Sequence, residues 1–135
     1  MDKKVLVLCT KNSCRSIIGE ALINSQLEGV TAYSSGIDPS GHVNPNVKKI
    51  LKAHGDWNDN YHSKVLDEVI DIDFDLVITV CDHAKESCPL FPKEVPVIHI
   101  GFEDPDGKGY EAFEAVYQEI KEQLLPAIQK KLKEK

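Results

Sequence analysis

The sequence predicts an α/β fold: a four-stranded parallel sheet flanked by helices on both faces. Short apolar and β-branched runs alternate along the chain with longer segments whose apolar residues recur every three to four positions. Such alternation is typical of strand–helix–strand units, in which the strands run parallel. The densest β-branched run, residues 74–80, suits a strand buried on both faces of the sheet.

The chain opens with a predicted strand, a helix and a second strand. The strand covers residues 4–8, and apolar residues at helical spacing predict a helix over 13–27. Gly29 is placed to end that helix. A β-rich stretch over 30–34 gives the second strand, which Gly36 closes.

Two helices are predicted in the middle of the chain. Asn44 and Pro45 have the pattern of an N-cap followed by proline at the first helical position, and Gly55 stops the helix that they open. Ser63 is placed to cap a second, short helix over 63–70. The strand within 74–80 follows it directly.

The last part of the chain supplies a fourth strand and a long helix. The strand covers 95–100, and Pro96 near its start suits an edge position. The helix covers 110–132, where Pro126 should kink or split it. Its buried stripe is predicted to be Phe113, Val116, Tyr117, Ile120 and Leu124.

Composition restricts the class of protein. The 135 residues suit a single catalytic domain over 1–135 with a core that needs no disulfides. The net charge of −6 argues against a nucleic-acid partner. We expect a cytoplasmic protein with no membrane association, because no run has signal-peptide or transmembrane character. We expect a monomer, because no long exposed apolar stripe is evident. In that reducing compartment, four cysteines indicate catalysis, metal binding or redox cycling.

A cysteine and an arginine bracket five residues directly after the first strand and before the first helix. A loop in that position aims successive backbone N–H groups at one point, where a tetrahedral anion can sit. The same field and the Arg15 guanidinium stabilise a Cys9 thiolate, lowering its pKa from ~8.5 into the range ~3.5–7.5. The forked donors of Arg15 can hold two oxygens of the anion. The predicted oxyanion-binding residues are Thr10, Lys11, Asn12, Ser13, Cys14, Arg15 and Ser16.

Ligands of parallel sheets collect at the carboxyl ends of the strands. Cys9 follows the first strand, Cys81 follows the third, and Asp104 lies just beyond the fourth. All three are therefore expected on one rim. A carboxyl above an anion site can protonate a departing oxygen when burial or a neighbouring charge raises its pKa. Pro105 restricts Asp104 to an extended geometry.

Cys81 and Cys88 form a separate pair. Six intervening residues is not zinc-ligand spacing, and no second pair completes four ligands, so we expect no metal. If the segment is helical, the two Cα atoms lie roughly 10 Å apart, whereas a disulfide needs them within ~7 Å. Oxidation then requires the segment to unwind, which makes the pair a candidate redox switch.

Each assignment has a structural alternative. Cys9 could be a small apolar side chain at a strand end, with Arg15 in solvent. Asp104 could belong to an ordinary turn built from aspartate, proline and glycine. Cys81 and Cys88 could be unrelated cysteines. Their combination in one chain favours the catalytic interpretation.

Together these residues resemble the thioredoxin-coupled arsenate reductases, which are built on the low-molecular-weight protein tyrosine phosphatase fold. The similarity runs through nearly the whole chain. Its motifs are Cys-Thr-x-Asn-Ser-Cys-Arg-Ser at 9–16, Ser35-Gly36, Asn44-Pro45, the Cys81 and Cys88 pair, and Gly-Phe-x-Asp-Pro at 101–105. Phosphatases of this fold share the loop and the Asp-Pro, so the resemblance implies that the added cysteine pair marks a reductase.

The resemblance implies a three-cysteine relay from arsenate to arsenite. Cys9 attacks the arsenic of bound arsenate, while Asp104 protonates the leaving hydroxide. Cys81 then attacks the Cys9 sulfur and expels arsenite, and Cys88 attacks Cys81. Reduced thioredoxin recycles the Cys81–Cys88 disulfide, with no bound organic cofactor. Asn12 is implied to shape the loop, Ser16 to stabilise the thiolate and Cys14 to serve packing.

Two positions depart from the family pattern. Lys11 stands where family loops commonly have glycine. Either the backbone at this position does not need a positive φ, or the lysine makes the loop strained. Some members bind potassium through residues corresponding to Asn12, Glu20, Ser35 and an aspartate. The best register places Lys64 at the aspartate, so we expect its ammonium to replace the ion and remove potassium dependence.

Two other functions fit parts of the pattern. In a low-molecular-weight protein tyrosine phosphatase, water would attack the covalent intermediate. Phosphotyrosine-specific members usually carry aromatic residues after Asp-Pro, whereas Asp106 and Gly107 follow here, so we expect only residual phosphatase activity. A non-enzymatic thiol redox sensor would use Cys81 and Cys88 and would tolerate loss of Arg15.

Overall fold

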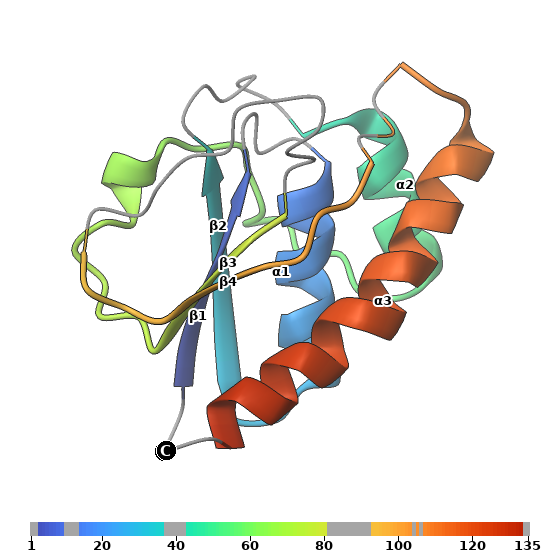
Figure 1. Ribbon diagram of the computed structural model, residues 1–135. Helices are drawn as coiled ribbons and strands as arrows, with labels where there is room; N and C mark the ends of the chain where they lie inside the picture. Colours follow the sequence, from blue (N-terminus) through green and yellow to red (C-terminus); the bar gives the residue numbers. More distant parts are fainter. Residues whose placement is uncertain are drawn as a thin grey trace.

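The computed structural model describes residues 3–9, 14–36, 43–80, 93–103, 105 and 107–133. Its elements follow the predicted order along the chain (Figure 1). They are β1 (Lys3–Cys9), α1 (Arg15–Gln26), β2 (Val30–Gly36), α2 (Pro45–Ala53), the 3₁₀ helix η1 (Leu66–Glu68), β3 (Leu76–Thr79), β4 (Val97–His99) and α3 (Tyr110–Lys133).

The four strands form one parallel sheet in the order β2-β1-β3-β4. The carboxyl ends of β1 and β2 lie together at the top of Figure 1, as a parallel sheet requires. β4 is an edge strand, and Pro96 precedes its first residue. The predicted four-stranded parallel sheet is confirmed, and so is the edge position of the strand that Pro96 opens.

Two hydrophobic clusters cover opposite faces of the sheet. On one face, Val5 and Val7 of β1 pack in the larger cluster with buried side chains of α1, α2 and α3. On the other face, Leu6 and Leu8 pack with Phe74 in the segment around η1. Because successive side chains of a strand point to opposite faces, β1 is buried on both sides. Figure 1 shows the three α-helices on one side of the sheet and the η1 segment on the other.

The caps of α2 are those expected from its sequence. Asn44 occupies the N-cap, and its side-chain oxygen accepts a hydrogen bond from the backbone N–H of Asn46 at 2.9 Å. Pro45 is the first helical residue, where its missing N–H costs nothing. After the helix, Gly55 adopts a positive φ of 78°, which a residue with a side chain rarely takes.

The short helix predicted over 63–70 is reduced to the three residues of η1, and Ser63 does not cap it. The N-cap position belongs to Val65, whose backbone is extended. The backbone N–H of Gly36 donates to the Lys64 carbonyl at 2.9 Å, and Gly36 also forms a β-bridge with Val65. This pairing with the end of β2 holds the chain extended where a helix would otherwise begin.

α3 is one continuous helix through Pro126, so the predicted split does not occur. Proline inside a helix removes one hydrogen bond and costs about 3 kcal/mol. Here Leu124, Leu125 and Ile128 are buried on either side of it, and their packing offsets that cost. The predicted stripe is confirmed: Phe113, Val116, Tyr117, Ile120 and Leu124 are all buried.

A buried carboxylate joins the three α-helices. Asp56, just after α2, is 6% exposed and accepts hydrogen bonds from Ser25 of α1 at 2.6 Å and from the hydroxyl of Tyr117 of α3. The His54 ring stacks on the Tyr117 ring with centroids 4.2 Å apart. Burial and the neighbouring Asp56 raise the pKa of Tyr117 well above its usual range.

We expect Tyr117→Phe to lower the free energy of unfolding by about 2 kcal/mol at neutral pH, because it leaves a buried carboxylate one donor short. The folded pKa of Tyr117 exceeds its unfolded value of ~10, so its contribution is complete below pH ~10 and is lost as pH rises further. The difference in the free energy of unfolding between wild type and variant, measured by urea unfolding, should therefore become smaller above that pH. Tyr110→Phe, on the same helix, is the control and should change stability by less than about 0.5 kcal/mol. Equal losses in both variants would contradict this assignment.

Candidate active site

Cys9 ends the strand at the centre of the sheet. It is the last residue of β1, is 3% exposed, and lies opposite Gly36 in the register with β2. The next described residue is Cys14, also 3% exposed, directly before α1. Its carbonyl accepts the N–H of Ile18 at 3.0 Å and so begins the helix. The strand predicted before residues 10–13 and the helix predicted after them are therefore both present.

Arg15 is the first residue of α1 and the only arginine in the chain. Its side chain is 2% exposed, and one guanidinium nitrogen (Nη1) donates to the Phe102 carbonyl at 3.1 Å. Arginine is almost never fully buried unless it is paired, and burying its charge is costly without compensating acceptors or anions. The alternative that places Arg15 in solvent is therefore wrong. Ser16, the next residue, is also buried.

Backbone hydrogen bonds join three segments that are far apart in the sequence. The N–H of Val80 donates to the Leu8 carbonyl at 3.1 Å, and the N–H of Phe102 donates to the Val80 carbonyl at 3.2 Å. Arg15 of α1 donates a hydrogen bond to the Phe102 carbonyl and so connects the helix to these three segments. Each segment stands one or two positions before a predicted catalytic residue, respectively Cys9, Cys81 and Asp104.

Seven of the predicted site residues lie outside the described part of the chain. They are Thr10, Lys11, Asn12 and Ser13 of the loop, the pair Cys81 and Cys88, and Asp104. Cys9, Cys14, Arg15 and Ser16 are described and lie together at the junction of β1 and α1.

The structure brings together some of the residues that the resemblance relates to a potassium site. The Lys64 ammonium lies 4.0 Å from a carboxylate oxygen of Glu20, and both side chains are buried. Ser34, which sequence reasoning did not select, donates its hydroxyl to the same Glu20 oxygen at 2.6 Å. Because side chains alternate along β2, Ser35 points to the opposite face of the sheet. Its buried hydroxyl has no partner among the residues that the structure describes.

Sequence reasoning also missed a polar pair at the carboxyl ends of β3 and β4. The Thr79 hydroxyl lies 2.7 Å from Nδ1 of His99, and the two residues are aligned in the strand register. Thr79 stands two positions before Cys81. A histidine at a strand end was the only signal, and it did not reveal which neighbour the imidazole would meet.

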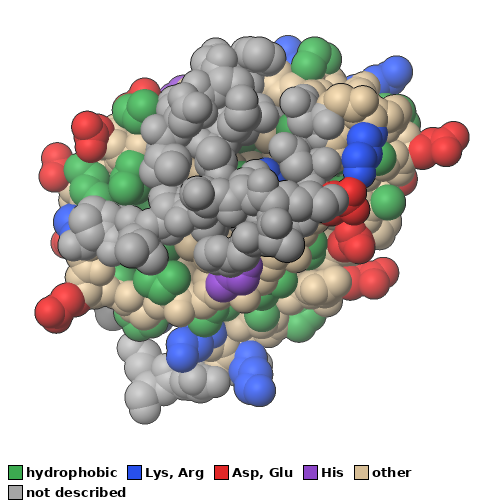
Figure 2. Space-filling view, turned by 45° about the horizontal axis from the view of Figure 1, so that its top comes forward, with side chains coloured by type: hydrophobic (Ala, Val, Ile, Leu, Met, Phe, Trp, Pro, Cys, Tyr) green, Lys and Arg blue, Asp and Glu red, His purple; other side chains and the backbone are tan. Residues whose placement is uncertain are grey.

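The face at the carboxyl ends carries no continuous basic patch among the described residues. Figure 2 shows acidic and basic side chains interspersed around it. Across the described ranges, no group of three or more His, Cys, Asp or Glu side chains is placed to hold a metal ion. No helix within those ranges is long and apolar enough to cross a membrane.

The family model for low molecular weight phosphotyrosine protein phosphatases matches residues 4–135. The chain belongs to this family. An arsenate reductase of Bacillus cereus (strain G9842) is 41% identical over 123 residues, which cover 90% of this chain and 91% of that protein. The crystal structure of an arsenate reductase from Archaeoglobus fulgidus has a TM-score of 0.83 and 33% identity, covering 93% of this chain and 98% of the other. The thioredoxin-dependent arsenate reductase of Corynebacterium glutamicum has a TM-score of 0.69 and 30% identity, covering 95% of this chain and 62% of the other.

These similarities confirm the resemblance drawn from the motifs, and the predicted phosphatase-like fold with it. Relatives that share this much of their length with the chain are enzymes, so this member of the low molecular weight phosphatase family is an enzyme.

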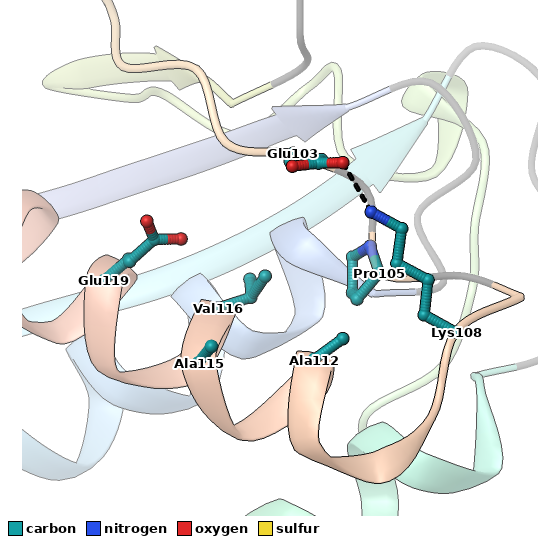
Figure 3. A pocket seen from close by; sticks show the side chains of 7 residues that line it. All are labelled: Glu103, Pro105, Lys108, Ala112, Ala115, Val116 and Glu119. Carbon is teal, nitrogen blue, oxygen red and sulfur yellow. Dashed lines mark hydrogen bonds and ion pairs between the residues drawn. The ribbon is translucent and has the colours of Figure 1, made fainter.

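A small pocket of about 250 Å³ lies between the segment that follows β4 and the first turns of α3. Figure 3 shows its lining, with the Lys108 ammonium paired to the Glu103 carboxylate. The lining residues are Glu103, Pro105, Lys108, Ala112, Ala115, Val116 and Glu119. None of these residues is aromatic.

Proposed function

We propose that the protein is an arsenate reductase in which Cys9, Cys81 and Cys88 relay two electrons to arsenate and reduced thioredoxin restores them. One observation carries the proposal: backbone hydrogen bonds join Leu8 to Val80 and Val80 to Phe102, and Arg15 binds the Phe102 carbonyl. The segments that continue to Cys9, to Cys81 and to Asp104 therefore begin side by side at the buried Arg15. The similarity to arsenate reductases along nine-tenths of the chain supports the substrate, and the Corynebacterium glutamicum neighbour supports the reductant.

In the first step the Cys9 thiolate attacks arsenic. A sulfur–arsenic bond forms, one arsenic–oxygen bond breaks, and the leaving hydroxide takes a proton from Asp104 to depart as water. Arg15 and the N–H groups of the loop from Thr10 to Ser16 hold the remaining oxygens. The hydrogen bond from Arg15 to the Phe102 carbonyl fixes the guanidinium against the segment that carries Asp104. The acid, Asp104, and the group that holds the arsenate oxygens, Arg15, would therefore keep a fixed position relative to each other.

In the second step the Cys81 thiolate attacks the Cys9 sulfur, and a Cys9–Cys81 disulfide forms. The sulfur–arsenic bond breaks, its electron pair stays on arsenic, and arsenite leaves with arsenic reduced by two electrons. Cys88 then attacks Cys81, which releases Cys9 as thiolate and leaves a Cys81–Cys88 disulfide. Thioredoxin transfers two electrons from its dithiol to that disulfide. The cycle needs no bound organic cofactor and no metal.

Two observations weigh on the other functions. A thiol sensor has no use for a costly buried guanidinium at the strand–helix junction, yet Arg15 is buried there. A phosphotyrosine phosphatase needs a surface for the aromatic ring, and the residues that follow Asp104 and Pro105 in the sequence, Asp106 and Gly107, supply no ring. Phosphate and arsenate are both tetrahedral oxyanions, so a low phosphatase activity toward small aryl phosphates is expected. We further propose that the chain acts as a single-domain monomer in the reducing cytoplasm.

The proposal is tested by arsenate-dependent NADPH consumption with thioredoxin and thioredoxin reductase present. Wild type should turn over steadily. Cys88→Ser should release at most one arsenite per chain, because no cysteine of the chain can then attack Cys81 and release Cys9 from the Cys9–Cys81 disulfide. Because buffer thiols could reduce that disulfide, the assay is run without them. Equal steady rates for the two proteins would contradict the relay. Absence of arsenate-dependent turnover in wild type would contradict the reductase assignment itself.

A further inference from the structure

A buried pair of opposite charges joins α1 to the segment that follows α2. Glu20 of α1 is 6% exposed and Lys64 is 7% exposed, with 4.0 Å between the ammonium nitrogen and a carboxylate oxygen. The ammonium also donates to the His62 carbonyl at 2.9 Å. The same Glu20 oxygen accepts the Ser34 hydroxyl at 2.6 Å. The Lys64 nitrogen is therefore held among oxygen atoms that come from α1 and from the segment after α2.

Oxygen atoms of these kinds can contribute ligands to a cation. A carboxylate, a hydroxyl and a backbone carbonyl are typical ligands of hard cations. An ammonium is a compact point charge with three donors and is close in size to a potassium ion. A free potassium ion does not fit beside these residues, because the Lys64 nitrogen already occupies the space between Glu20 and the His62 carbonyl.

The charge balance explains why a cation is needed here. Burial raises the pKa of Glu20, and the nearby Lys64 ammonium acts in the opposite direction and favours the carboxylate. Burial lowers the pKa of Lys64, and Glu20 again opposes the shift. Each charge is thus compensated by the other, and loss of one would leave the other buried and uncompensated.

The pair is connected to the nucleophile strand by two backbone contacts. The Lys64 carbonyl accepts the N–H of Gly36, and Gly36 lies opposite Cys9 in the register of β1 with β2. Glu20 stands four residues after Ser16 and so lies on the same side of α1. Lys64 is thus joined through β2 to the strand that ends at Cys9, and Glu20 lies on the helix that begins at Arg15.

We propose that Lys64 is a tethered monovalent cation, whose ammonium fills the place that the resemblance to the arsenate reductases assigns to a potassium ion. The chain then carries its own cation and does not respond to potassium. Removal of the lysine side chain should open a potassium site lined by Glu20, Ser34 and the His62 carbonyl. This inference concerns the folded protein and does not depend on the proposed reaction with arsenate.

The experiment measures the thermal unfolding midpoint in chlorides of potassium, sodium and choline at equal ionic strength. Wild type should unfold at the same temperature in all three salts. Lys64→Ala should unfold roughly 10 °C lower in choline chloride, because a buried carboxylate loses its partner. Potassium should restore part of that loss with saturation, and more effectively than sodium, because a ligand that binds only the folded state raises the midpoint.

Two further variants separate a cation site from a general loss of packing. Lys64→Met keeps most of the side-chain volume and leaves no room for an ion, so its lowered midpoint should not respond to potassium. The double variant Glu20→Gln with Lys64→Met removes both charges, and its midpoint should exceed that of Lys64→Met alone.

Three outcomes would overturn the inference. The first is a midpoint of wild type that rises with potassium over sodium. The second is a Lys64→Ala protein that responds equally to all three salts. The third is a Lys64→Ala protein that stays unfolded even at saturating potassium. Because none of these measurements uses arsenate, an inactive protein would leave the cation result intact.

Discussion

Cys9→Ser should abolish arsenate reduction, with a fall in kcat of roughly four orders of magnitude or more. A serine hydroxyl is not ionised near neutral pH and cannot form the disulfide that releases arsenite. Cys9 ends the central strand β1, so the substitution changes one atom of a well-held residue. Thioredoxin-coupled turnover and single-turnover arsenite release should both be lost, since the first bond to arsenic never forms.

The matched control for this variant is Cys14→Ala. Cys14 is as buried as Cys9 and lies at the other end of the loop, but the relay gives its sulfur no role. Its backbone N–H survives the substitution, so activity should stay within about tenfold of wild type. If the two variants lost activity equally, Cys9 would not be the distinctive nucleophile. Measurable reduction by Cys9→Ser would contradict the first step of the mechanism.

Arg15→Lys should lower kcat/KM for arsenate by about 10²–10³-fold, although it keeps the positive charge. An ammonium cannot present a planar fork to two oxygens while also reaching the Phe102 carbonyl, which Arg15 binds at 3.1 Å. The loss should appear in kcat as well as in KM, because the clamp is expected to act mainly on the charge that develops in the transition state. Saturation kinetics with arsenate measure both constants.

Lys108→Gln is the control for a general effect of charge at this face. It removes an exposed ammonium that pairs with Glu103 beside the same segment, and it should change kcat/KM by less than about threefold. Arg15→Lys also distinguishes the enzyme from a thiol sensor. A sensor would still form its Cys81–Cys88 disulfide with peroxide and would lose no function. Undiminished arsenate turnover in Arg15→Lys would exclude the proposed anion clamp.

The strands and helices could be predicted because each has a local cause. The β-branched run within 74–80 gave β3, and Asn44 with Pro45 gave the start of α2. The errors arose where tertiary contacts compete with local preference. Gly36 holds residues 64 and 65 extended, which prevents a helix from starting at Ser63. Packing on both sides of Pro126 keeps α3 continuous.

The part of the candidate site that the structure describes, at the junction of β1 and α1, could be predicted for a similar reason. Strand ends in a parallel sheet share one rim, so the residues that follow them could be grouped from the chain order alone. The burial of Arg15 could not be predicted, since it depends on the Phe102 carbonyl, which is distant in sequence. The choice of Ser34 rather than Ser35 beside Glu20 follows from strand alternation, which needs the orientation of β2. The contact of Thr79 with His99 required the pairing of β3 with β4.

The most direct test of the three-cysteine relay is to map the disulfides after a single turnover. The fully reduced protein is given arsenate without thioredoxin, alkylated, digested and analysed by mass spectrometry, with arsenite measured in parallel. We predict one arsenite per chain with a Cys81–Cys88 disulfide in wild type, and a Cys9–Cys81 disulfide in Cys88→Ser. Arsenite formed while Cys81 and Cys88 stay reduced, or a disulfide that contains Cys14, would contradict the account.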